Sequence, residues 1–138
     1  MVMLSSVNYL AVLTATIVSF FLGFLWYGPL FGKRWMKLMN FTEKNIKNMK
    51  LTPMKAMTLG FVTTLITVYV LAMFLKIAQV ETISSGLIIG FWIWLGFFAT
   101  TSLGSFLWEG KSINLYLFNN AFNLINILIV SGILSVWK

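Results

Sequence analysis

The chain has 138 residues, of which 59% are hydrophobic and 9% are charged, with ten basic and three acidic side chains and a net charge of +7. Soluble domains carry about 25% charged residues, so this composition excludes an ordinary water-soluble domain and indicates a single membrane domain over residues 1–138. With no Cys, no His and no acidic residue other than Glu, the chain lacks the usual disulfide, nucleophilic and metal-cluster chemistry, and we expect no enzyme activity, no cofactor and no metal.

Long stretches without charge predict four membrane-spanning helices. Residues 1–32 carry no charged side chain, and neither do 56–75, 82–108 and 112–137. A helix needs about 20 apolar residues to cross a hydrocarbon core of about 30 Å, and four spans cannot form a closed barrel of strands. We therefore expect an all-α, polytopic membrane protein with four transmembrane helices in a bundle. The approximate ranges of these helices are 5–28, 54–76, 83–108 and 113–137.

The first apolar stretch has a second interpretation as a signal peptide. Signal peptides carry positive charge before their apolar run, whereas in this chain the positive charge follows it. We expect a retained helix whose N-terminus faces away from the cytoplasm. Its end is predicted at Gly28-Pro29, because proline lacks a backbone N–H and disfavours helix at the residue before it.

A basic segment, residues 33–52, follows the first span. At 100° per residue, its apolar and basic side chains fall on opposite faces, which predicts an amphipathic helix lying on the membrane surface. A break near Asn40 would divide it, with Thr42 as the N-cap of the second half. An irregular, solvated loop is the alternative. The residues expected to contact anionic lipid headgroups are Lys33, Arg34, Lys37, Lys44, Lys47 and Lys50.

The distribution of basic residues also predicts the orientation. Seven of the ten lie between Lys33 and Lys55, and loops rich in Lys and Arg remain in the cytoplasm. The basic segment is therefore expected in the cytoplasm, with both termini outside and the protein in the plasma (inner) membrane. Such a cluster is a topology signal, so nucleic acid is not expected as a partner.

The third span carries small residues at helical spacing. Gly86 and Gly90 form a GxxxG pair, and Gly96, Thr100 and Gly104 form a second ladder on a different face. Small residues let helix backbones approach closely in lipid, so this helix is expected to pack on two partners at once. The same pattern serves packing within one chain or between copies in a homo-oligomer.

Two further features of the third span involve polar groups. Trp92 and Trp94 lie in mid-span, and their indole N–H groups require acceptors, which the asparagines of the fourth span can supply through their carbonyls. Glu109 is a carboxylate at the membrane boundary. We expect it to form an exposed ion pair with Lys111 or the basic segment, and not to act as a proton site.

The fourth span has the most unusual polar content. Tyr116, Asn119, Asn123 and Asn126 fall within about 80° of one another on a helical wheel, with Asn120 beside them, and these five residues are the polar stripe. An amide left unpaired in hydrocarbon costs about 2–7 kcal/mol, so the polar stripe is expected to face protein or water. Two interpretations stay open: the amides bond to neighbouring helices, or they line a path or pocket for a small neutral solute.

Motifs along nearly the whole chain carry a resemblance to a known family. They are Asn8-Tyr9, Trp26-Tyr27-Gly28-Pro29-Leu30-Phe31-Gly32-Lys33, Trp35-Met36, Gly90, Trp94-Leu95-Gly96-Phe97, Glu109-Gly110-Lys111-Ser112, Asn120-Ala121 and Trp137. In these the chain resembles the domain of unknown function 1761 family. The run from Trp26 to Lys33 is the most specific motif, and Asn40 stands where family members often have Gly. The resemblance implies a four-helix integral membrane protein, and no activity or ligand comes with it.

Three functions are compatible with these features. The leading hypothesis is a non-enzymatic structural or interaction protein that forms a homo-oligomer in the lipid bilayer. The first alternative is a channel or carrier for a small neutral solute, lined by the polar stripe. The second alternative is a protein that binds anionic lipid through the basic segment.

Overall fold

The computed structural model describes residues 7–40 and 52–137, which form helices and no strand. The helices are α1 (Tyr9–Leu25), the π-helical turn η2 (Trp26–Leu30), α2 (Gly32–Met39), α4 (Pro53–Ile77), α5 (Ile83–Ile93), the π-helical turn η3 (Trp94–Ala99), α6 (Thr100–Ser102), α7 (Gly104–Leu107) and α8 (Ile113–Val136).

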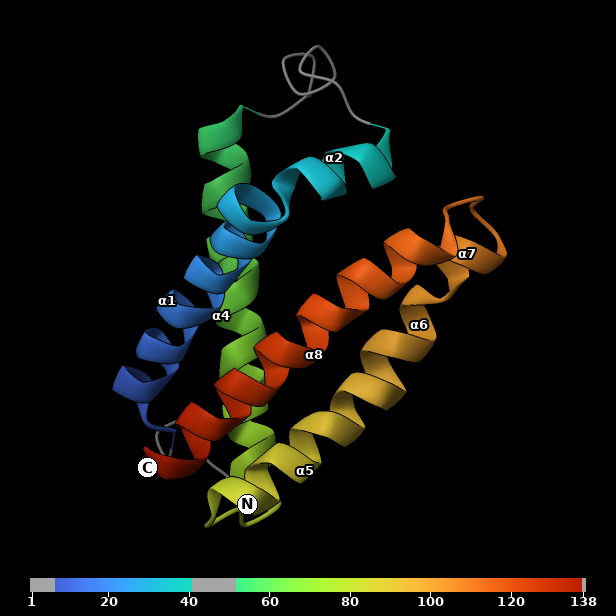
Figure 1. Ribbon diagram of the computed structural model, residues 1–138. Helices are drawn as coiled ribbons and strands as arrows, with labels where there is room; N and C mark the ends of the chain where they lie inside the picture. Colours follow the sequence, from blue (N-terminus) through green and yellow to red (C-terminus); the bar gives the residue numbers. More distant parts are fainter. Residues whose placement is uncertain (1–6, 41–51, 138) are drawn as a thin grey trace.

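Four of these helical stretches are long and apolar enough to cross a membrane: Tyr9–Leu30, Met54–Ile77, Ile83–Leu107 and Ile113–Val136. The prediction of an all-helical protein with four membrane-length helices is therefore confirmed. The third stretch comprises α5, η3, α6 and α7 in succession (Figure 1).

Each long helix begins at a polar side chain that caps its first turn. The capping residues are Asn8, Thr52, Thr82 and Ser112, whose side-chain oxygens accept main-chain N–H groups three residues ahead at 3.1–3.2 Å. The first four N–H groups of a helix have no partner within it, so each cap satisfies a donor that would otherwise be left at the edge of the apolar region. Local sequence chemistry thus sets where each span starts.

The chain bends sharply where α1 meets α2. Gly28 leaves the helical region, with φ −119° and ψ −106°, and Pro29 follows it. The Phe31 N–H donates to the Trp26 carbonyl at 3.1 Å and closes this turn, so that no loop separates η2 from α2. A Cβ added at Gly32 would lie 2.8 Å from the Tyr27 carbonyl oxygen, so only glycine fits here without a shift. As a result, α2 points away from the direction of α1 (Figure 1).

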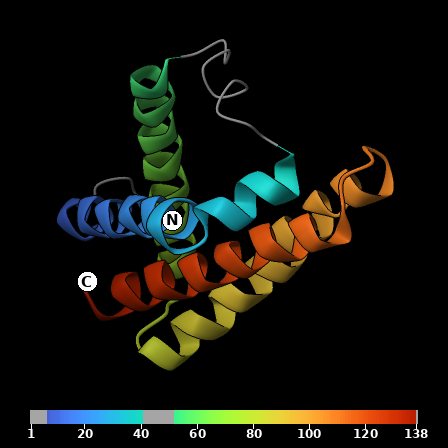
Figure 2. The ribbon, with the colours of Figure 1, turned by 45° about the horizontal axis from the view of Figure 1, so that its top comes forward.

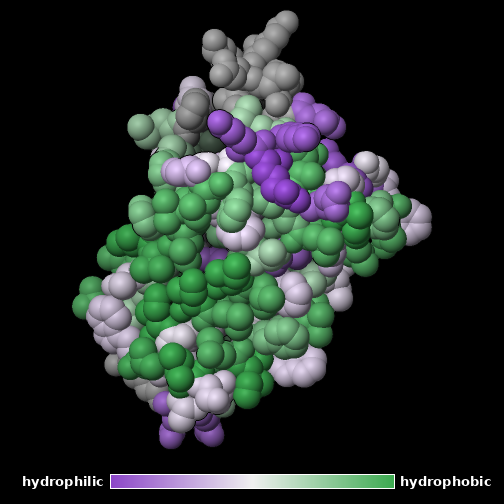
Figure 3. Space-filling model, in the orientation of Figure 1, coloured by the Kyte–Doolittle hydropathy of each residue, from purple (hydrophilic) through white to green (hydrophobic). Residues whose placement is uncertain are grey.

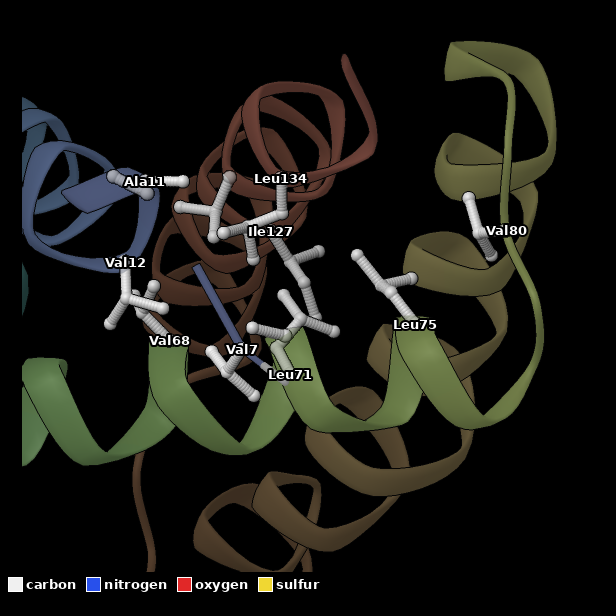
Figure 4. Packing of buried hydrophobic residues seen from close by; sticks show 12 residues of the cluster. Val7, Ala11, Val12, Val68, Leu71, Leu75, Val80, Ile127 and Leu134 are labelled. Atoms are coloured by element: carbon white, nitrogen blue, oxygen red, sulfur yellow. The ribbon is translucent and has the colours of Figure 1, made fainter. Parts of the chain in front are cut away.

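Helix α8 lies between the other long helices. It packs against α5 on one side and against α1 and α4 on the other, and it has the largest buried share of the four spans. In both ribbon views α8 runs beside α5 and α6 (Figures 1 and 2). In the core, Val12 of α1, Val68 and Leu71 of α4 and Ile127 of α8 point toward one another (Figure 4). The polar stripe is therefore carried by the central helix.

The outer surface of the molecule is largely apolar. Exposed side chains on α8 include Leu117, Ile125 and Ile129, which recur at helical spacing. Figure 3 shows hydrophilic side chains gathered at the end where α2 lies, above a broad apolar surface. An apolar surface of this extent matches lipid as its surroundings and not water.

The GxxxG pair of α5 packs against a pair of serines on α8. A Cβ added at Gly90 would lie 2.5 Å from Ser131 Oγ, and one added at Gly86 would overlap the side chain of Ser135, whose Cβ would be only 2.8 Å away. Ser131 and Ser135 are themselves buried. The two helices therefore approach at a distance that only hydrogen at Gly86 and Gly90 permits.

This close approach predicts a stability difference between glycines. Gly86→Ala and Gly90→Ala should each lower the free energy of unfolding by about 1–3 kcal/mol, because the methyl group overpacks the contact between α5 and α8. Gly96→Ala is the matched control: its Cβ would meet nothing within 4 Å. Thermal unfolding of the purified protein in detergent measures the difference, and equal melting temperatures for all three variants would contradict this packing.

Candidate functional site: the polar stripe of α8 and two cavities

Half of the amides of the polar stripe are bonded within the protein. The amide of Asn120 is buried and donates to the Ser102 hydroxyl at 2.9 Å and to the Tyr116 carbonyl at 3.0 Å. The single proton of the Ser102 hydroxyl is shared between the Phe98 carbonyl at 2.6 Å and Asn120 Oδ1 at 3.2 Å. Asn119 Oδ1 accepts from the Tyr27 hydroxyl at 2.8 Å. These two amides link α8 to α6 and to η2, which is the interhelical bonding that one interpretation of the stripe predicts.

The π-helical turn η3 forms further hydrogen bonds with α8, one as donor and one as acceptor. Trp94, its first residue, donates its indole N–H to the main-chain carbonyl of Asn120 at 3.0 Å, and Ala99, its last residue, accepts from the Tyr116 hydroxyl at 2.6 Å. A π-helical turn alters the regular ladder of main-chain bonds and lets side chains reach carbonyls. Trp92 differs, since it is 61% exposed on the apolar surface.

The other two amides have no hydrogen-bond partner in the part of the chain that the structure describes. Among the described residues, Asn123 and Asn126 make no side-chain hydrogen bond, and Asn126 Oδ1 is enclosed without a partner. Both residues line a cavity of about 600 Å³, the mid-helix cavity, which lies between α1, α4 and α8. The polar stripe thus divides along α8 into a bonded part and a part that faces a cavity.

The wall of the mid-helix cavity is uncharged. Helix α4 contributes Thr63, Thr64 and Thr67, and α1 contributes Ser19, which is buried. Aromatic and aliphatic side chains form the rest of the wall. None of the described residues that line this cavity is charged, so its chemistry is that of hydroxyl and amide groups set in an apolar surface.

A second cavity, of about 490 Å³, lies next to the first on the side of α2. This α2-side cavity is lined by Trp35, Ser105 and the bonded part of the polar stripe, and Tyr27 and Asn123 line both cavities. The hydrogen bond between Tyr27 and Asn119 therefore lies where the two cavities adjoin. The Tyr27 ring is held by edge-to-face contacts, with centroid distances of 5.6 Å to Trp35 and 5.4 Å to Phe122.

The remaining predicted residues lie away from the cavities. Gly96 and Thr100 are exposed, and Gly104 is half-buried beside the ring of Trp108, so the second ladder of small residues faces outward and not toward another helix of the chain. Glu109 is also exposed. On α2, Lys33, Arg34 and Lys37 are exposed. The predictions for Thr42, Lys44, Lys47 and Lys50 lie outside the described residues.

Sequence reasoning missed the residues that complete the cavity walls. Ser19, Tyr27 and the α4 threonines are polar groups within apolar spans, and this was the available signal. The threonines recur at spacings of three and four residues, which places Thr63 or Thr64 on the same helix face as Thr67. Among the described residues no group of three His, Cys, Asp or Glu could hold a metal ion.

These features define a class of protein: all-helical, with four helices of membrane-spanning length and uncharged cavities lined by amide and hydroxyl groups. A family model described as "Protein of unknown function (DUF1761)" matches residues 10–135. The chain therefore belongs to this family, and the resemblance seen in its motifs is confirmed. No curated protein and no solved structure matches the chain in the same comparisons.

The division of the polar stripe predicts unequal effects of two similar substitutions on stability. Asn120→Leu should lower the free energy of unfolding by about 1–3 kcal/mol, because the buried side chain loses its hydrogen bonds to the Ser102 hydroxyl and the Tyr116 carbonyl. Asn123→Leu removes an amide without a partner and should change stability by less than about 0.5 kcal/mol or increase it. Denaturation in mixed detergent micelles compares them, and a larger loss for Asn123→Leu than for Asn120→Leu would contradict the division.

Proposed function

We propose that this protein is a non-enzymatic membrane protein that binds a small neutral solute in the mid-helix cavity and passes it toward the α2-side cavity. The observation that carries the proposal is the pair of amides, Asn123 and Asn126, that line the mid-helix cavity without a hydrogen-bond partner in the described part of the chain. A buried polar group without a partner costs about 1–3 kcal/mol. A solute or water in the cavity recovers that free energy.

The absence of charge on the described cavity wall supports a neutral solute. An ion that leaves water needs an opposite charge or a dense set of ligands, and amide and hydroxyl groups at these few positions supply neither. A neutral solute loses only hydrogen bonds, which Asn and Thr side chains can replace. Tyr27 and Asn123 line both cavities, so a solute would have only a short distance to cross from one cavity to the other.

The proposed setting is a four-helix bundle that crosses the plasma (inner) membrane with both termini outside. In it, α2 lies along the cytoplasmic surface as an amphipathic helix. Exposed Lys33, Arg34 and Lys37 and half-buried Trp35 and Leu38 support this arrangement, because such a helix places its basic side chains among headgroups and its apolar side chains toward the protein and lipid. The α2-side cavity then opens toward the cytoplasm.

Solute flux into proteoliposomes tests the proposal. Wild-type protein should accelerate glycerol or urea entry, measured by light scattering after rapid mixing, relative to protein-free liposomes. The double variant Asn123→Leu/Asn126→Leu should lose this acceleration, because leucine fills the cavity and removes both amides. Asn114→Leu is the matched control, since Asn114 is exposed in the first turn of α8 and does not line the cavity. Flux that survives the double substitution would contradict the proposal.

Homo-oligomerisation and binding of anionic lipid are separate proposals with their own support. The face that carries Gly96 and Thr100 is exposed, and a Cβ at Gly96 would meet nothing within 4 Å, so a second helix can approach there. Native mass spectrometry of protein released from anionic bilayers measures both the number of copies in the complex and the lipid bound to it. We expect more than one copy in the wild type, fewer in Gly96→Leu, and retained anionic lipid that high salt removes. A lipid-free monomer would contradict both.

A further inference from the structure

The threonines on the α4 wall of the mid-helix cavity donate their hydroxyl protons to main-chain carbonyls of α4. The hydroxyls of Thr63 and Thr64 donate to the Gly60 carbonyl at 2.9 and 2.8 Å, and that of Thr67 donates to the Thr63 carbonyl at 3.0 Å. A hydroxyl has one proton and two acceptor lone pairs. With the proton bonded to the main chain, each of these oxygens can only accept a further hydrogen bond.

The other two helices present donors to the same cavity. Among the described residues, the amides of Asn123 and Asn126 on α8 have no partner, and neither does the hydroxyl of Ser19 on α1, which is only 4% exposed. An amide has two N–H donors as well as its oxygen. The cavity therefore combines an α4 wall that accepts with α8 and α1 walls that can also donate.

From this combination we infer the chemical class of the solute: a neutral molecule that carries at least one O–H or N–H donor together with an acceptor, as small polyols and primary amides do. Its donors bond to the oxygens of Thr64 and Thr67, and its acceptor bonds to Asn123 or Asn126. This inference rests on the proposed function, which requires only that the solute be neutral. A ketone or ether of the same size accepts but does not donate, so the threonine oxygens discriminate against it.

A matched pair of competitors separates these two classes of solute. Acetamide and acetone have nearly the same shape, and they differ in the replacement of an NH₂ group by CH₃. Each is added at equal concentration to both sides of proteoliposomes, and glycerol entry is then measured. Acetamide should slow protein-dependent glycerol entry and acetone should leave it unchanged. Equal inhibition by both would overturn the inference, and so would no inhibition by either.

Substitution of the threonines tests the same point from the side of the protein. Thr64→Val/Thr67→Val keeps the volume of both side chains and removes both acceptors, and it should lower protein-dependent glycerol entry about tenfold, because each lost hydrogen bond weakens binding several-fold. Thr58→Val is the matched control. Thr58, like Thr67, is exposed on α4 and makes the same kind of main-chain bond, to the Met54 carbonyl at 2.9 Å, but it does not line the cavity.

The outcomes distinguish the inference from the function on which it rests. The variant Thr64→Ser/Thr67→Ser retains both hydroxyls and should restore glycerol entry, which shows that the valine variant failed through lost acceptors and not through misfolding. If the valine variant transports glycerol as the wild type does, while Asn123→Leu/Asn126→Leu abolishes entry, the solute class is wrong and the proposed function stands. If the wild type itself gives no acceleration, both are wrong.

Discussion

A primary amide in the hydrocarbon layer either finds a hydrogen-bond partner or destabilises the helix that carries it, by about 2–7 kcal/mol. Helix α8 carries four of these groups within about two turns, from Asn119 to Asn126. The protein meets this constraint in two ways. Asn119 and Asn120 bond to side chains of neighbouring helices, whereas Asn123 and Asn126 lie beside a cavity. On α8 the exposed positions Leu117, Ile125 and Ile129 are apolar, so this face presents hydrocarbon and no amide.

The packing of the other helices is consistent with this division along α8. Toward its C-terminus, Gly86 and Gly90 of α5 allow close contact with Ser131 and Ser135, with no room for a side chain at either glycine. Toward its N-terminus, the π-helical turn η3 brings the Trp94 indole and the Ala99 carbonyl into hydrogen bonds with α8. Between these regions, on the side of α1 and α4, the chain leaves a cavity of about 600 Å³.

Much of the fold follows from local sequence. The four long helices are predicted by the length of the charge-free stretches, and their first turns by capping residues such as Ser112. The inward turn of the polar stripe follows from the cost of an unpaired amide. The division within the stripe does not follow, because Asn120 and Asn123 have the same side chain and nearly the same helical face. Only their distances from Ser102 and from the α4 threonines separate them, and these depend on how three helices pack.

Other features of the structure cannot be predicted from the sequence pattern for the same reason. The π-helical turn at Trp94–Ala99 changes the register of α5 relative to α6. That stretch contains no proline and no pair of glycines from which the turn could be predicted. Gly86 and Gly96 belong to similar ladders in the sequence, yet a Cβ added at Gly86 would overlap Ser135 of α8, whereas one added at Gly96 would meet no described residue within 4 Å. The ladder used inside the protein is the one that meets serines on α8, and that match requires knowledge of which helices are neighbours.

Thiol accessibility tests most directly whether the unpaired amides of α8 face a water-accessible cavity and not lipid. Because the chain has no cysteine, a single introduced thiol reports on one position in the otherwise unmodified protein. Membrane-embedded Asn123→Cys and Asn126→Cys should react with a small water-soluble thiol reagent, whereas Ile125→Cys and Ile129→Cys, on the lipid-facing side, should not. Reaction at positions 125 and 129 with protection at 123 and 126 would place the amides in lipid and contradict the account.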